Sequence, residues 1–197
     1  MKKKINIKKN TEKLWSLKIP ININGVNKDI KEYLIICEEK LGLVPNILKT
    51  NTIDKRKFDA FNIFYNRLMQ EENFLKKVEK EMIAVVVSSL NRCLYCCVSH
   101  SYNLGKLMND KILSKKILIN YKIAELSKKH KEMLNFAEKL TLTSHLIDES
   151  DRNKLRKVNF TEHHILEIIE VCAFFNMTNR IASGTNMQPN KEYYFTQ

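Results

Sequence analysis

Apolar side chains recur every three to four residues over most of the chain, which is the spacing of one face of an α-helix. Four stripes of this kind comprise Phe58, Phe61, Phe64, Tyr65 and Leu68; Val78, Met82, Val85, Val86 and Ser89; Met133, Phe136, Ala137 and Leu140; and Ile165, Ile168, Ile169 and Cys172. In the second stripe, the run at 85–87 favours a strand by local propensity. The charged residues at 79–81 lead directly into a continuous stripe, so we predict a helix there as well.

Start and stop signals frame these stripes. A helix is predicted over 29–41 and ends at Gly42, because glycine readily takes the left-handed conformation found after a helix C-terminus. Asp148 is placed to cap a helix through Val158, and Thr161 to cap the last main helix. Only four Gly and three Pro occur in 197 residues, too few turn residues for a sandwich or barrel. The predicted fold class is therefore all-α.

The N-terminal region has a different pattern. Apolar and polar residues alternate from Trp15 to Ile23 as in an extended segment, and Asn24-Gly25 is typical of a turn. We divide the chain into an extended N-terminal arm, residues 1–34, and a helical domain, residues 35–197. The apolar fraction of 44% suffices for a buried core and excludes a disordered chain.

The charge first suggests a nucleic-acid partner. Lys and Arg number 34 against 22 Asp and Glu, so the formal net charge is 34 − 22 = +12. The lysines are scattered among many Asn and Ile residues, however, and Arg, which nucleic-acid surfaces combine with aromatic residues, is scarce. We interpret the charge as a solvated basic surface and expect no nucleic-acid partner.

No segment is predicted to direct the chain into or across a membrane. The basic N-terminus lacks a following apolar region of a secretory signal, and runs such as 83–87 are far too short to span a bilayer. We expect a cytoplasmic protein without a membrane partner. Clustered cysteines in that reducing compartment indicate redox or metal chemistry rather than structural disulfides. The five are Cys37, Cys93, Cys96, Cys97 and Cys172.

The cysteine cluster is the candidate site. In a helix that begins near Cys93, capped by Asn91, the side chains of Cys93, Cys96, Cys97 and His100 share one stripe. A helix N-terminus and a nearby imidazole both favour the thiolate, which is the reactive form. Cys93 and Cys96 are close enough in sequence to close a disulfide across one turn.

A carboxylate could complete this site. Glu81 precedes Cys93 by twelve residues, about 18 Å along a straight helix, so it reaches His100 only if the chain bends between them. Asn91-Arg92 is the natural place for the bend. A carboxylate folded back onto the imidazole would orient it as a base.

The full spacing resembles a known signature. Glu-x11-Cys-x2-Cys-x3-His is similar to the active site of the alkylhydroperoxidase AhpD-like family, within the carboxymuconolactone decarboxylase superfamily. Flanking segments resemble its peroxidase-related enzymes over roughly residue 35 to the C-terminus. These segments are Leu41-Gly42-Leu43-Val44-Pro45-Asn46, the terminal helix from Ala173 to Ser183, Asn120-Tyr121 before Ala124-Glu125-Leu126, and Pro189-Asn190 before Tyr193-Tyr194.

The resemblance implies an all-helical, AhpD-like peroxidase with peroxiredoxin activity that needs no cofactor and no metal. Cys96 would be the peroxidatic cysteine and Cys93 the resolving one, while Glu81 and His100 would form a proton relay through a water. The cycle would pass from thiolate to sulfenate to a Cys93–Cys96 disulfide. Its partners would be a hydroperoxide, hydrogen peroxide or organic, an external dithiol of the lipoyl or thioredoxin type, and further copies of the chain in a homo-oligomer (dimer, trimer or hexamer).

Two departures from the family stand out. Tyr95 occupies a position inside the CxxC segment where better-studied AhpD proteins have a histidine. Cys97 is an extra thiol beside the proposed nucleophile, either a buried apolar filler or a competing resolving thiol. Cys37 and Cys172 lie on apolar faces and are predicted to be core residues.

Other interpretations remain open at this stage. The dithiol could serve a disulfide reductase or a redox sensor, and Cys93, Cys96 and His100 could be three zinc ligands, although no paired motif supplies a fourth. The chain could also be a non-enzymatic basic adaptor with a structural Cys/His site. The apolar face of the last main helix is interrupted by Asn176, Asn179 and Arg180. These residues could form a buried polar network, a subunit contact or a pocket wall.

Overall fold

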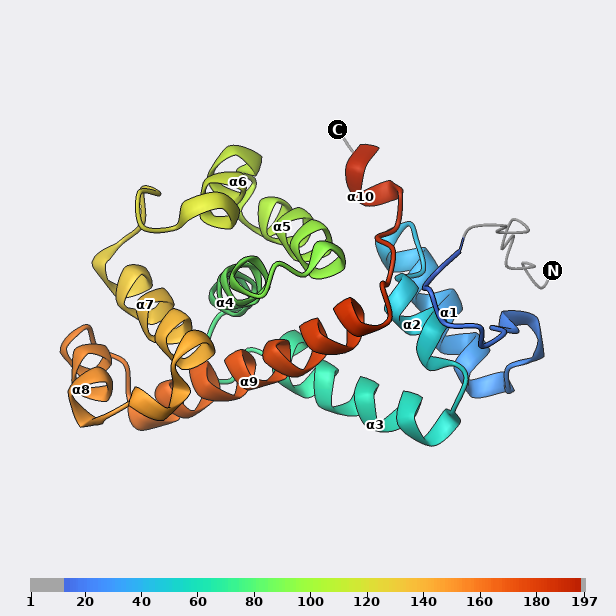
Figure 1. Ribbon diagram of the computed structural model, residues 1–197, viewed down its shortest axis with the longest axis horizontal. Helices are drawn as coiled ribbons and strands as arrows, with labels where there is room; N and C mark the ends of the chain where they lie inside the picture. Colours follow the sequence, from blue (N-terminus) through green and yellow to red (C-terminus); the bar gives the residue numbers. More distant parts are fainter. Residues whose placement is uncertain (1–12, 196–197) are drawn as a thin grey trace.

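The computed structural model describes residues 13–195, and these residues form helices with no strand (Figure 1). The helices are α1 (Lys28–Leu41), α2 (Asn46–Asn51), α3 (Lys55–Tyr65), α4 (Lys77–Leu90), α5 (Leu94–Met108), α6 (Lys111–Asn120), α7 (Lys128–Leu142), α8 (Glu149–Lys157), α9 (Glu162–Gly184) and α10 (Glu192–Phe195). Short 3-10 turns lie at Ile23–Gly25 and Ser144–Leu146, and a π-helical turn, Asn66–Gln70, follows α3. The all-α prediction is confirmed.

The predicted helix boundaries are confirmed at their caps. Gly42 follows α1 with φ of 75° and donates its N–H to the carbonyl of Glu38. Asp148 and Asp151 form a reciprocal capping box at the start of α8. The side chain of Thr161 accepts a hydrogen bond from the backbone of His164 at the start of α9. These contacts satisfy backbone groups that helix ends leave unpaired.

Helix α4 lies at the centre of the larger part of the fold, in contact with α5, α6, α7 and α9 (Figure 1). Every residue over 83–87 is at most 1% exposed. A helix buried on all sides is apolar all round, which explains why the valine run there sits in a helix despite its strand propensity. Within residues 13–195, no helix combines the length and the hydrophobicity needed to cross a bilayer.

A buried ion pair connects α4 to α9. The Lys80 ammonium, on a fully buried side chain, lies 2.7 Å from a carboxylate oxygen of Glu167. The second carboxylate oxygen accepts hydrogen bonds from the backbone N–H groups of Phe74 and Leu75, just before α4. Because each charge is desolvated, each needs its partner, and the pair fixes the start of α4 against α9.

The N-terminal helices form a second part with its own smaller core, made of Ile30, Leu34, Val44, Leu48 and Phe58. In Figure 1, α1 and α2 lie at one end of the molecule and α8 at the other, with α9 extending along much of the length between them. Before α1, the chain is hydrogen-bonded to the segment after α9, from Ser16 N–H to Thr185 O and from Gln188 N–H to Leu14 O. Residues 1–12 of the predicted arm lie outside the described residues, and the division at residue 34 stays a prediction.

Candidate active site

The turn between α4 and α5 brings the site residues together. Arg92 has a φ of 52°, in the left-handed region, and the Cys93 N–H donates to the carbonyl of Ser88. The chain therefore reverses at 91–92, the place where the sequence suggests a bend, and α5 runs back along α4. Asn91 is not the N-cap of α5, contrary to our expectation: it follows the end of α4, and Cys93 occupies the N-cap position.

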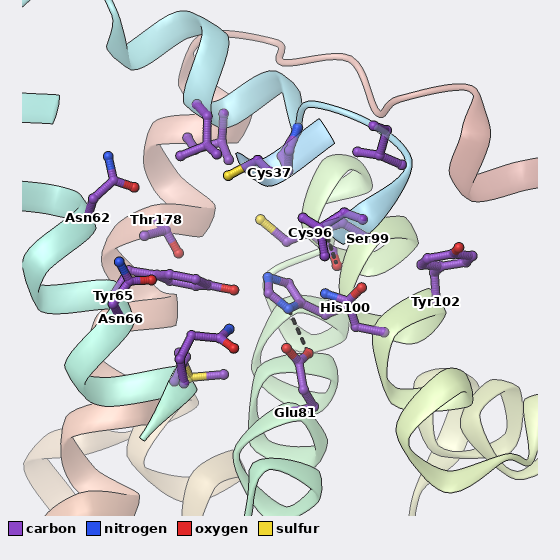
Figure 2. Close-up of a pocket in the computed structure, with 18 of the residues that line it drawn as sticks. Cys37, Asn62, Tyr65, Asn66, Glu81, Cys96, Ser99, His100, Tyr102 and Thr178 are labelled. Atoms are coloured by element: carbon purple, nitrogen blue, oxygen red, sulfur yellow. Dashed lines mark hydrogen bonds and ion pairs between the residues drawn. The ribbon is translucent and has the colours of Figure 1, made fainter. Parts of the chain in front are cut away.

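This reversal places Glu81 of α4 against His100 of α5. The Glu81 carboxylate oxygen Oε2 lies 2.8 Å from His100 Nδ1, and both side chains are buried. The ring of Phe175 packs edge-on against the imidazole at 4.6 Å. The carboxylate fixes the ring orientation, so that the other nitrogen, Nε2, faces the pocket between Tyr65 and Cys96 (Figure 2).

The two cysteines of the CxxC segment lie within hydrogen-bonding reach of each other. A hydrogen bond from the Cys96 thiol, helped by the Cys96 backbone N–H, the Ser183 hydroxyl and the nearby His100, lowers the pKa of Cys93 to about 6 against the opposing effect of burial. The hydrogen bond to Cys93, together with burial, raises the pKa of Cys96. The pair therefore gives up its first proton readily and its second with difficulty, as coupled groups do.

Access distinguishes the two sulfur atoms. Both cysteines are buried, at 1% and 3% exposure for Cys93 and Cys96, but only Cys96 lines the adjacent pocket. Cys97 is half-buried and does not line that pocket, and burial raises its pKa to about 11. A molecule in the pocket can therefore contact Cys96, whereas Cys93 does not line the pocket.

The pocket has a volume of about 720 Å³ and lies among α1, α3, α5 and α9 (Figure 2). Aromatic rings of Phe61, Tyr65 and Phe174 line it, and Tyr65 directs its hydroxyl toward His100. Burial, together with the Glu81 carboxylate, raises the pKa of Tyr65, so the phenol stays protonated. Sequence reasoning placed Tyr65 in a core stripe and did not foresee its role as a pocket wall.

Cys37 also departs from the sequence prediction. We expected a core residue, but it is half-buried and lines the same pocket from α1. Burial raises its pKa to about 11. Cys172, by contrast, is fully buried as predicted, with its thiol near the hydroxyl of Thr141.

Asn176 and Asn179, which interrupt the apolar face of α9, belong to a partly buried polar network beside the turn, whereas Arg180 is exposed. The Asn91 amide donates to the side-chain oxygens of Asn176 and Asn179, and the Asn179 amide donates to the Ser88 hydroxyl. Asn179 also reaches the Cys96 thiol. Of the interpretations left open by the sequence, this favours a polar network, which holds the α4–α5 turn and the thiol pair against α9.

Two of the flanking segments that resemble the family, residues 41–46 and 189–190, are joined by hydrogen bonds. The Asn46 N–H donates to the side-chain oxygen of Asn190, whose amide donates back to the Val44 carbonyl. Tyr95, the departure inside the CxxC segment, accepts a hydrogen bond from the Ile47 N–H through its hydroxyl. Its hydroxyl thus ties α5 to α2, next to the pocket wall.

No group of three or more His, Cys, Asp or Glu side chains within residues 13–195 is arranged to hold a metal ion.

Comparisons with known proteins identify the family of this chain. The model of the carboxymuconolactone decarboxylase family matches residues 57–107, which include Glu81, both cysteines of the CxxC segment and His100. No match was found among curated proteins.

Solved structures extend the likeness to almost the whole chain. A peroxidase-related protein from Silicibacter sp. TM1040 is 43% identical with a TM-score of 0.91, over 94% of this chain and 96% of that one. An alkylhydroperoxidase AhpD core protein, also peroxidase-related, from Ralstonia eutropha JMP134 is 31% identical with a TM-score of 0.89, over 94% and 97%. The debrominase Bmp8, at 17% identity and a TM-score of 0.73 over 85% and 89%, shares the fold. The chain therefore belongs to the AhpD-like proteins of the carboxymuconolactone decarboxylase superfamily.

Proposed function

We propose that this protein is a thiol-dependent peroxidase that reduces hydrogen peroxide or organic hydroperoxides through a Cys96 sulfenate and a Cys93–Cys96 disulfide. One observation carries the proposal: Cys96 lines a pocket beside the Glu81–His100 pair, and the Cys93 thiol lies within hydrogen-bonding reach of Cys96. A peroxidatic thiol needs access to its substrate, a proton path and a partner thiol. Cys96 has all three.

Proton sharing within the thiol pair supplies the nucleophile. Near neutral pH the pair holds one proton, on Cys96, while Cys93 carries the negative charge. Transfer of that proton across the hydrogen bond to Cys93 leaves a thiolate on Cys96, facing the pocket. This thiolate attacks the terminal oxygen of the hydroperoxide, the O–O bond breaks, and the leaving alkoxide takes a proton from the Glu81–His100 relay.

The second half of the cycle restores the relay. Cys93 gives its proton to His100 and attacks the Cys96 sulfenic acid, so that an S–S bond forms and the S–O bond breaks. The hydroxide released takes up a proton from solvent, equivalent to the one that the thiol pair lost before the reaction, and leaves as water. An external dithiol of the lipoyl or thioredoxin type then reduces the disulfide and is itself oxidised to a disulfide.

The pocket favours organic hydroperoxides as substrates. Its volume of about 720 Å³ and its aromatic lining far exceed what hydrogen peroxide needs. Lys40 and Lys106 line it with exposed side chains, and their charges favour hydroperoxides that carry an anionic group.

A disulfide reductase is the second candidate, and the low pKa of Cys93 favours it. In such an enzyme the cysteine at the helix N-terminus attacks the substrate disulfide as a thiolate. Cys93, however, is only 1% exposed and does not line the pocket, so a substrate disulfide would have to displace the residues that cover it. The peroxidase therefore fits the site better.

Mass spectrometry of the cysteine-containing peptide, before and after one equivalent of cumene hydroperoxide, tests the proposal. We expect a Cys93–Cys96 disulfide and multiple turnovers with a dithiol reductant. Cys96→Ser is expected to abolish turnover, whereas Cys97→Ser, the matched control outside the pocket, is expected to retain it. Oxidation by a disulfide substrate but not by any hydroperoxide would instead identify a reductase.

A further inference from the structure

The Asn62 side chain lies in the pocket wall on α3 and is 5% exposed. Its amide nitrogen donates to the carbonyl of Phe58 at 2.8 Å. Only the NH₂ end of an amide can face a carbonyl oxygen, so this hydrogen bond fixes which way the amide points. The oxygen Oδ1 is directed toward the pocket interior (Figure 2).

This oxygen is the buried side-chain polar atom that stands out in the described part of the chain, because no described residue donates a hydrogen bond to it. A buried acceptor without a donor costs free energy, and native proteins rarely tolerate one. A bound molecule with an N–H or O–H group at this position would remove that cost. The pocket wall therefore selects for a hydrogen-bond donor on its ligand.

The surrounding side chains indicate the rest of the ligand. Phe61 stacks on Tyr65 with ring centroids 6.1 Å apart and planes within 8°, and Phe61 meets Phe174 at 5.7 Å. All three rings line the pocket beside Asn62. Flat apolar molecules pack well against such walls.

The charged residues of the pocket indicate the charge of the ligand. Lys40, Lys77 and Lys106 line the pocket, while the one carboxylate among the lining residues, Glu81, is already engaged with His100. A cationic donor such as an ammonium group would be repelled by the lysines. A neutral or anionic molecule would not.

We propose that Asn62 is a specificity-determining residue, and that the pocket takes an aromatic compound whose neutral N–H or O–H group donates to Asn62 Oδ1. The proposal rests on the proposed function, because it takes the pocket beside Cys96 as the substrate site. The bound molecule would be an aromatic hydroperoxide with a second donor group distant from the reacting oxygen. Asn62 would hold that group and orient the hydroperoxide toward Cys96.

Indole and benzofuran test this interaction because they share one shape but only indole has an N–H donor. Their affinities are measured by isothermal titration calorimetry on the full chain carrying Cys96→Ser, which removes turnover. We expect indole to bind about twofold to twelvefold more tightly than benzofuran, the range of one neutral hydrogen bond. Adding Asn62→Leu is expected to abolish this preference by weakening indole binding while benzofuran still binds.

Asn66→Leu is the matched control. Asn66 lines the same wall one turn later, but its amide already donates to the Tyr33 hydroxyl at 3.2 Å, so the preference for indole is expected to persist. If Asn62→Leu still binds benzofuran, its pocket is folded. If leucine does not fit at this position, Asn62→Ser is used instead, and the preference for indole is expected to be lost in that variant as well.

Three results would overturn the proposal: equal affinities in the parent, a preference that survives both Asn62 substitutions, or no binding of either compound. Turnover of cumene hydroperoxide by the unmodified protein is measured in parallel. If turnover occurs without the indole preference, the recognition proposal fails and the peroxidase stands. If the preference is present without turnover, the peroxidase fails and the recognition proposal survives as a binding site.

Discussion

Replacing Cys96 by alanine is expected to raise the pKa of Cys93. The largest cause of its low value, about 6, is the hydrogen bond from the Cys96 thiol, which alanine removes. The backbone N–H of residue 96 and the Ser183 hydroxyl remain as donors, so the pKa should rise most of the way toward the ordinary value of 9.0. At pH 7 a thiol of pKa 6 is about nine-tenths ionised, whereas one of pKa 8 is about one-tenth ionised.

The assay is the pH dependence of iodoacetamide alkylation, with the modified cysteine located by fragmentation of the peptide. Cys96→Ser is the matched control, because the serine hydroxyl still donates a hydrogen bond to Cys93 and should keep more of the low pKa. We expect the alkylation midpoint of Cys93 to lie at least about one pH unit higher with alanine than with serine. Equal midpoints would refute the reasoning, since the low pKa would then not depend on a donor at residue 96.

Further predictions concern the relay, the fold and the pocket rim. Glu81→Gln keeps the shape of the side chain but cannot support a charged His100, so the second-order rate of peroxide reduction should fall at least about tenfold in stopped-flow measurements; an unchanged rate would exclude the relay. Lys80→Met leaves the Glu167 carboxylate buried without its cation and should lower the free energy of unfolding in urea by about 3–5 kcal/mol, while Lys55→Met, in an exposed pair, should leave the free energy of unfolding nearly unchanged. The first pKa of the thiol pair, about 6, lies below that of an unfolded thiol, so the stability it contributes is lost as pH falls through about 6. The Tm of the reduced protein, measured by calorimetry relative to the disulfide form, should accordingly rise between pH 6 and 8. If the lysines at the pocket rim attract the substrate, turnover of an anionic hydroperoxide should fall with added salt, whereas turnover of a neutral hydroperoxide should not. Equal salt dependence for the two substrates would exclude a role for these charges in substrate binding.

The sequence predicted the helices well because their apolar stripes are regular. It also indicated how Glu81 meets His100, since a bend at 91–92 was the only way to bring them together. The prediction that Asn91 caps the N-terminus of α5 was wrong. Asparagine is a common N-cap, but here Arg92 takes the left-handed conformation and the Asn91 amide serves Asn176 and Asn179 instead.

The pocket could not be predicted from local pattern. Cys37 of α1 and Tyr65 of α3 belong to apolar faces, and periodicity does not distinguish a face that packs against a core from one that encloses a cavity. The distinction depends on where α1 and α3 lie relative to α5, which long-range contacts decide. Asn62 is the exception, because a polar residue within an apolar stripe needs a hydrogen-bond partner. Its position could therefore have indicated a pocket wall.

The support of the thiol pair comes from segments far apart in the sequence. Cys93 and Cys96 pack in one small core with Ala182 and Met187 from the end of α9 and the segment after it. That C-terminal segment continues to Asn190, which holds Asn46 before α2, while Tyr95 holds Ile47 from between the two cysteines. Reduction of a disulfide changes the distance between its sulfur atoms, yet neither cysteine can move far without disturbing α2 and the end of α9. The site is therefore rigid behind the sulfur atoms and open only on the pocket side of Cys96, an arrangement that favours a small substrate approaching Cys96 over a protein disulfide approaching Cys93.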